Sequence, residues 1–230
     1  MKNKRVANPA EAVSGVFDGA TVLIGGFGLG GLPEALLDAL CDRKVRGLTI
    51  VNNNSGHGET GIGRLIGEGC VAKVICSFPT SKAAYVFKEW FEAGKIEVEV
   101  VPQGTLAERI RCGGAGLGGF LTRTGLGTEI AENKKVVAVN GREYLLEQPL
   151  RGDFALVEAD LVDPRGNLTY RMAARNFNPV MATAADQVLV QANREVGLGD
   201  IDPAVVITPG LFVDRYCIVD SVAKTPARAG

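Results

Sequence analysis

Short apolar runs alternate with helix-like segments through the first half of the chain, and this alternation most restricts the folds open to it. The runs have the length of a strand, and the segments between them repeat apolar residues at helical spacing. Continuously apolar strands are typical of a parallel sheet that helices cover on each side. The strands are expected at residues 20–26, 48–53, 72–78 and 96–104, and the helices at residues 9–17, 33–44, 63–69, 82–95 and 105–113.

The second half of the chain has a different pattern. Asn140-Gly141 separates two strand-like runs within residues 134–147, which is the strongest short signal for a hairpin. We therefore predict an α/β fold with an open, mostly parallel sheet, helices on both faces and a small subsidiary region that contains the β-hairpin. Further buried strands are expected at residues 153–163, 187–192 and 204–210.

Length and composition limit the class of protein. With 230 residues, the chain is expected to form one domain over residues 1–222, followed by a mobile tail at residues 223–230. The 25 Lys and Arg nearly balance the 26 Asp and Glu, so no charge surplus attracts nucleic acid or an anionic membrane. No apolar stretch approaches the roughly 20 residues of a membrane span. The five scattered cysteines, without a C-x-x-C pair, indicate reduced thiols in a cytoplasmic protein.

A glycine-rich turn lies between the first predicted strand and the helix after it, in the sequence LIGGFGLGGLPEALLDAL (residues 23–40). Gly26, Gly28 and Gly31 form the pattern G-x-G-x-x-G, which is typical of dinucleotide-binding turns. Backbone N–H groups in such a turn can face a phosphate, and the positive end of the helix from Pro33 would add to the attraction. Glycines that only permit a tight turn explain the pattern equally well, and at this point both interpretations stay open.

The position where a dinucleotide site needs an acid carries amides instead. An Asp or Glu that binds the ribose is expected at the end of the second strand, about 20 residues after the glycines. Asn52, Asn53 and Asn54 stand there. The nicotinamide interpretation is therefore disfavoured.

Side chains suited to covalent or metal chemistry are few. His57 is the single histidine and has no obvious acidic partner, so we interpret it as a solvated loop residue. Together with scattered cysteines it cannot form an ordinary zinc site, and no metal is expected. What remains is the amides of Asn52 to Asn54 and of Gln103, each group at the end of a predicted strand. Amides can donate to a developing oxyanion but cannot be the nucleophile, so the chain has the character of half an active site. Turn formation by the same amides is the alternative.

Six segments resemble the class I CoA-transferase family, and they cover the chain in order from about residue 18 to residue 210. The resemblance is greatest with the α subunits of the succinyl-CoA:3-oxoacid enzymes, a group that includes 3-oxoadipate and acetate/acetoacetate transferases. One departure is Arg123, which stands where related chains usually carry proline. The segments are DGATVLIGGFGLGGLPE (18–34), VNNNSG (51–56), VVPQGTLAERIRCGGAGLGGFLT (100–122), GDFALVEA (152–159), GNLTY (166–170) and ARNFNP (174–179).

The resemblance implies an enzyme of α and β subunits, in an α2β2 assembly. It would move CoA from an acyl-CoA, succinyl-CoA first, to acetoacetate or 3-oxoadipate. In the family, a β-subunit glutamate within a Ser-Glu-Asn-Gly segment forms a glutamyl-CoA intermediate, and this sequence contains no such segment. No catalytic nucleophile is therefore expected in this chain, and no cofactor beyond CoA itself as a substrate moiety.

By the same resemblance, Asn53, Asn54 and Gln103 would act as supporting hydrogen-bond donors at the reacting carbonyl. An α subunit of an acetate or short-chain fatty acid CoA-transferase is an alternative function. A non-catalytic ligand-sensing domain of the same fold is more remote, because the chain lacks a DNA-binding segment or basic patch. CoA would contact the glycine turn at Gly25, Gly26, Phe27, Gly28, Leu29, Gly30 and Gly31.

Overall fold

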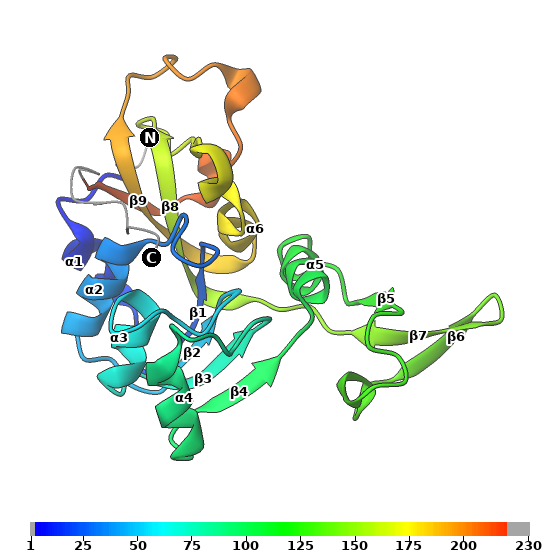
Figure 1. Cartoon of the computed structure of the whole chain (residues 1–230). Helices are drawn as coiled ribbons and strands as arrows, with labels where there is room; N and C mark the ends of the chain where they lie inside the picture. Colours follow the sequence, from blue (N-terminus) through cyan, green and yellow to red (C-terminus); the bar gives the residue numbers. More distant parts are fainter. Residues whose placement is uncertain (1–2, 220–230) are drawn as a thin grey trace.

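A seven-stranded parallel sheet forms the centre of the molecule, with the strand order β10-β9-β8-β1-β2-β3-β4 (Figure 1). The computed structural model describes residues 3–219. The predicted fold class is confirmed, and within this sheet every pairing is parallel. The strands are β1 (Thr21–Ile24), β2 (Leu48–Val51), β3 (Val71–Cys76), β4 (Glu97–Val100), β8 (Gly152–Val162), β9 (Ala185–Glu195) and β10 (Arg215–Ile218).

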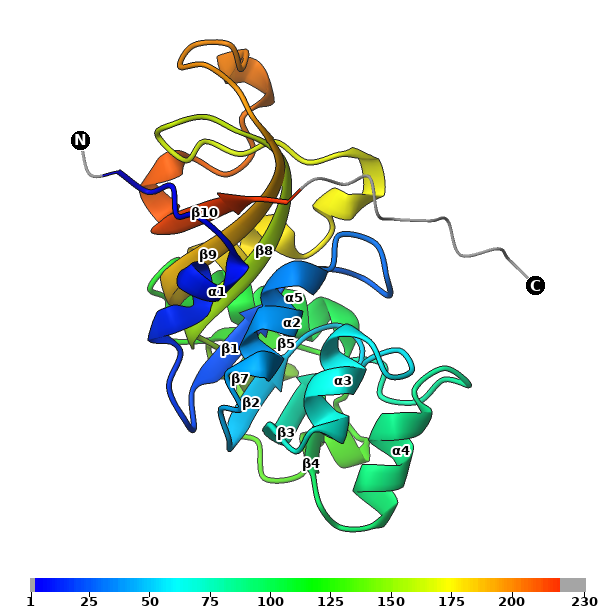
Figure 2. The same ribbon diagram turned by 90° about the vertical axis from the view of Figure 1, so that its left-hand side faces the viewer.

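Helices cover both faces of the sheet, as Figures 1 and 2 show together. Alternate strand residues bury their side chains in two separate cores: Val22 and Ile24 face one, and Leu23 faces the other. This is why the strands read as continuously apolar. One face carries α1 (Pro9–Ala12), α2 (Glu34–Asp42), α3 (Gly61–Gly67) and α4 (Tyr85–Glu92), and the other carries α5 (Gln103–Gly114) and α6 (Asn178–Thr183).

The chain reverses its direction across the sheet beside β1. It builds β1 to β4 outward on one side, and it later adds β8, β9 and β10 on the other side of β1. Open parallel sheets bind ligands at the carboxyl ends of the strands next to such a reversal. The glycine turn follows β1 and therefore lies at this point.

A small antiparallel sheet projects from the main body between α5 and β8 (Figure 1). Its strands are β5 (Phe120–Thr122), β6 (Val136–Val139) and β7 (Arg142–Glu147), in the order β5-β7-β6. Asn140 and Gly141 have φ angles of 50° and 73° between β6 and β7, as a two-residue type I′ turn requires. The predicted hairpin is confirmed. Arg123 is exposed directly after β5, and its carbonyl accepts a hydrogen bond from the N–H of Leu126.

The remaining short helices are one-turn segments in connections. They are η1 (Val13–Gly15), η2 (Glu129–Ala131), η3 (Met172–Arg175), η4 (Pro203–Val205) and η5 (Gly210–Phe212). No helix within residues 3–219 combines the length and the apolar character needed to cross a bilayer.

Two of the sequence expectations are wrong. Residues 204–210 are not a strand, because Pro203 and Pro209 cannot donate to a ladder; the segment makes a single bridge, between Thr208 and Leu168, and the last strand is β10. A Thr105–Glu108 capping box was expected to open the helix of residues 105–113, but α5 already begins at Gln103 and has no side-chain cap. The predicted tail at residues 223–230 lies outside the described residues, and the single domain over residues 1–222 stays a prediction.

Candidate functional site

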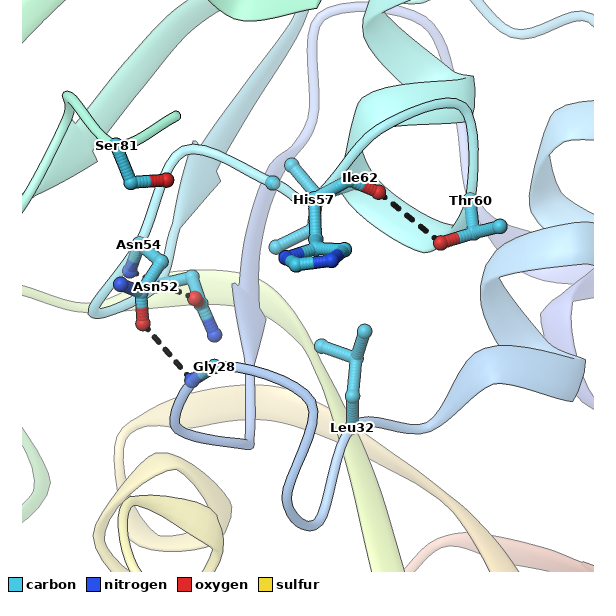
Figure 3. Close-up of a pocket in the computed structure, with 9 residues that line it drawn as sticks. Gly28, Leu32, Asn52, Asn54, His57, Thr60, Ile62 and Ser81 are labelled. Atoms are coloured by element: carbon cyan, nitrogen blue, oxygen red, sulfur yellow. Dashed lines mark hydrogen bonds between the residues drawn. The ribbon is translucent and has the colours of Figure 1, made fainter. Parts of the chain in front are cut away.

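Amide side chains from two different connections meet at the carboxyl edge of the sheet. Asn53 and Asn54 follow β2, while Gln103 opens α5 after β4, so the contact crosses the end of β3. The Nε2 group of Gln103 donates to Oδ1 of Asn53 at 2.7 Å, and Nδ2 of Asn53 donates to Oδ1 of Asn54 at 3.0 Å. The same oxygen of Asn54 accepts the backbone N–H of Gly28 at 2.9 Å (Figure 3). The structure thus brings together the residues that the sequence analysis singled out.

These amides differ in how far a ligand can reach them. Gln103 is exposed and Asn54 is half-buried, but Asn53 is only 1% exposed. Asn52 is also buried, and its Nδ2 group donates to the backbone carbonyls of Ile24 and Gly25 at the end of β1. Direct contact with a ligand is therefore open to Gln103 and Asn54, whereas Asn52 and Asn53 support them from below.

The backbone of the glycine turn is held mainly by the protein itself. Phe27 and Gly30 exchange two backbone hydrogen bonds, of 3.0 and 3.1 Å. The N–H groups of Gly25 and Gly26 donate to the carbonyl of Leu156 and to Oδ1 of Asn176. We expected these N–H groups to face a phosphate, but most of them already have protein acceptors.

The start of α2 is occupied in a similar way. The N–H of Glu34 donates to the carbonyl of Leu32, and the N–H of Leu36 donates to Oε1 of the buried Gln191 on β9. Pro33 precedes the helix rather than opening it. The exposed tip of the turn instead presents two large apolar side chains, Phe27 at 50% and Leu29 at 41% exposure.

The glycines of the turn serve two distinct purposes. Gly26, Gly28 and Gly31 have φ angles of 106°, 60° and 71°, a region that side chains with a Cβ rarely adopt. Gly25 has no room for a Cβ, because Oδ1 of Asn178 already fills that space. Gly30 has an ordinary φ and meets only the carbonyl of Phe27, at 3.5 Å. Tight turning and close packing therefore explain most of the pattern, and only Gly30 stands free of both demands.

Two asparagines that the sequence analysis did not assign hold both limbs of the turn. Asn176 accepts the N–H of Gly26 at 3.1 Å and donates to the carbonyl of Gly30 at 2.9 Å. Asn178, which is fully buried, donates to the carbonyl of Gly31 at 2.9 Å. Both lie in the segment ARNFNP, where only the resemblance drew attention to them. Nothing in the local pattern predicts that residues about 150 positions away would bind the turn.

Two hollows adjoin the amides and the turn. Figure 3 shows the first, where the ring of His57 lies near Leu32 and Ile62. The second, of about 340 Å³, lies between the turn and the start of α5. The first is lined by Gly28, Leu32, Asn52, Asn54, Gly56, His57, Thr60, Ile62 and Ser81, and the second by Phe27, Gln103, Gly104, Ala107, Asn176, Phe177 and Val180. None of these lining residues, all within the described part of the chain, is Asp or Glu.

Groups that could form a covalent bond are poorly placed. The five cysteine thiols are free and buried, and burial raises the pKa of Cys76, at the end of β3, to about 12. A thiol in that state is neutral near pH 7 and is a weak nucleophile. Glu59 is exposed in the loop before α3 and lines neither hollow. Within residues 3–219, no three His, Cys, Asp or Glu side chains cluster in a way that could hold a metal ion.

Residues 6–218 match the coenzyme A transferase family. The chain belongs to this family. It is 51% identical to the A-type subunit of the 3-oxoadipate CoA-transferase of Pseudomonas putida, over 98% of this chain and 97% of the relative. It is 45% identical to the alpha subunit of the acetate CoA-transferase of Escherichia coli K12, over 95% of this chain and 98% of the relative. The fold matches the crystal structure of glutaconate coenzyme A-transferase from Acidaminococcus fermentans with a TM-score of 0.85, at 19% identity, over 94% of this chain and 76% of that one.

Proposed function

We propose that this chain is the α subunit of a CoA-transferase that moves CoA from an acyl-CoA, most readily succinyl-CoA, to a 3-oxo acid. One observation carries the proposal: half of the residues are identical to those in one subunit of a 3-oxoadipate CoA-transferase, along almost the full length of both chains. The amide-rich site at the sheet edge is consistent with acyl transfer, in which a carbonyl oxygen becomes negative in the transition state.

The proposed assembly contains a β subunit, in an α2β2 arrangement. The relatives are named as single subunits, of type A or alpha, which supports a second subunit type. The hollows beside Gln103 and Asn54 are lined without a carboxylate. A glutamate nucleophile from the β subunit would supply the missing group and carry CoA as a thioester. We place the working enzyme in the cytoplasm, with no cofactor other than CoA as a substrate moiety.

The residues of this chain would hold and polarise the reacting group. Gln103 donates one N–H to Asn53 and keeps its second N–H for the substrate carbonyl. Asn54 keeps its Nδ2 group on the side of the first hollow (Figure 3). Fixed donors of this kind stabilise a developing oxyanion at little reorganisation cost. The exposed side chains of Phe27 and Leu29 would pack against the CoA ester and exclude water from it.

We favour 3-oxoadipate over acetate or another short-chain acid as the acceptor. The basis is the higher identity to the 3-oxoadipate enzyme, 51% against 45% for the acetate enzyme. A non-catalytic sensor is disfavoured, because the named relatives are transferase subunits over nearly all of the chain.

The test is reconstitution. The purified chain alone is expected to give no transfer from succinyl-CoA to 3-oxoadipate or acetoacetate, and addition of the purified β subunit should restore turnover. A panel of 3-oxoadipate, acetoacetate and acetate then ranks the acceptors by kcat/KM. Turnover by this chain alone, or no turnover by the assembled complex with any of the three acids, would contradict the proposal.

A further inference from the structure

The amide groups at the site form a directed chain, because only one orientation of each amide satisfies its neighbours. The backbone N–H of Gly28 can only donate, so Asn54 must turn its Oδ1 oxygen toward Gly28. Asn53 approaches that same oxygen and must therefore present its Nδ2 group. Oxygen and nitrogen are fixed here by hydrogen-bond logic rather than by electron count.

The same logic fixes the amide of Gln103. Because Nδ2 of Asn53 faces Asn54, Oδ1 of Asn53 points the other way and accepts Nε2 of Gln103 at 2.7 Å. A backbone N–H in the glycine turn thus sets the orientation of an exposed amide on α5 through two intervening asparagines.

Asn53 is itself rigidly placed. Its backbone carbonyl accepts the N–H groups of Ser77 and Phe78, at 3.1 and 3.0 Å, from the connection after β3. Its side chain is 1% exposed, so a substrate at the site cannot touch it.

We infer that Asn53 is a positioning residue, which holds the amide of Gln103 with its nitrogen inward and its second N–H available to the reacting carbonyl. The inference rests on the proposed function, in which Gln103 is the residue that touches the substrate. Without Asn53, the Gln103 amide is free to rotate and to exchange its oxygen and nitrogen. A reversed amide would place its oxygen against the developing oxyanion and oppose it.

A double-mutant cycle on the complex with the β subunit tests this role. We expect Gln103→Ala to lower kcat at least 100-fold and Asn53→Ala at least tenfold. In the Gln103→Ala background, Asn53→Ala should change kcat less than twofold, because the group through which it acts is gone. Asn53→Ala should act on kcat more than on the KM for acyl-CoA.

Asn167 provides a matched control. It is a partly buried asparagine that donates to Asp163 and accepts from Gly210, away from the amide chain. Asn167→Ala should affect kcat less than twofold, and by the same factor with and without Gln103→Ala.

An equal loss of kcat from Asn53→Ala in both backgrounds would overturn the inference and assign Asn53 a structural role only. If Asn53→Ala does not assemble, Asn53→Ser replaces it in the same cycle, because its hydroxyl fills less space but is polar. A wild-type complex without transferase activity would instead overturn the proposed function, so the two failures are distinguishable.

Discussion

Oδ1 of Asn178 lies where a Cβ atom on Gly25 would have to be. Asn178 reaches this place from α6, where its Oδ1 accepts the N–H of Glu158 at 2.9 Å and its Nδ2 donates to the carbonyl of Gly31. One buried amide thus joins β8, α6 and the glycine turn. It can do so only because residue 25 has no side chain.

This contact predicts a large effect of a single methyl group. Gly25→Ala should displace the Asn178 amide and leave buried backbone groups unpaired, at a cost of about 2–4 kcal/mol in the free energy of unfolding. Urea unfolding measures the loss. Gly30→Ala is the control, with an expected change below about 1 kcal/mol, because its Cβ meets only the carbonyl of Phe27. Equal losses in the two variants would contradict this account of Gly25.

Gly30 also gives the clearest test of whether CoA lies over the turn. Gly30→Val adds a side chain in open space without a positive φ, so the fold should survive while the KM for acyl-CoA rises about tenfold or more, equivalent to about 1.4 kcal/mol. Gly28→Val is less informative, because its φ of 60° makes any β-branched residue strained. Gly118→Val, at another open glycine with ordinary φ, is the control. If Gly30→Val leaves the KM unchanged, the turn does not contact CoA.

Sequence patterns predicted the parallel sheet because its strands are buried on both faces and bounded by glycine and proline. They also predicted the hairpin, because Asn140 and Gly141 must both adopt positive φ in a type I′ turn. They failed at residues 204–210, where an apolar run between two prolines covers the edge of the molecule without entering the sheet. Local hydrophobicity is the same in both cases, and only the missing proline N–H groups distinguish them.

The site was predictable in its residues and not in its connections. Strand ends placed Asn53 and Gln103 at the same edge, since carboxyl ends of parallel strands lie together. The order of burial, with Gln103 outside and Asn53 beneath it, depends on α5 beginning at Gln103, two residues before its expected start. The grip of Asn176 and Asn178 on the turn is a long-range contact and has no periodic signal.

Gln103 should matter for turnover far more than for stability. Gln103→Ala removes an exposed donor, so the complex should lose about 3 kcal/mol of transition-state stabilisation, which corresponds to 100-fold or more in kcat. The melting temperature should fall by at most a few degrees, because the side chain is exposed and makes one recorded hydrogen bond. Gln103→Glu keeps the size but replaces the amide NH2 with a second oxygen beside Asn53, so it should not restore kcat. Wild-type kcat in either variant, together with a lowered melting temperature, would make Gln103 a structural residue.

The buried thiols predict how stability depends on alkaline pH. Burial raises the pKa of Cys76 to about 12, far above the value of about 8.5 in an unfolded chain. A raised folded pKa means that this contribution to stability is complete below about pH 8.5 and is lost as the pH rises toward 12, because the unfolded state releases its proton first. Between pH 7 and pH 10 the loss from this thiol should be about 2 kcal/mol. Urea unfolding under reducing conditions measures it. Cys76→Ala should lose correspondingly less stability over the same interval, since any packing defect is the same at both pH values. An identical loss in the wild type and the variant would show that the Cys76 thiol reaches solvent in the folded protein.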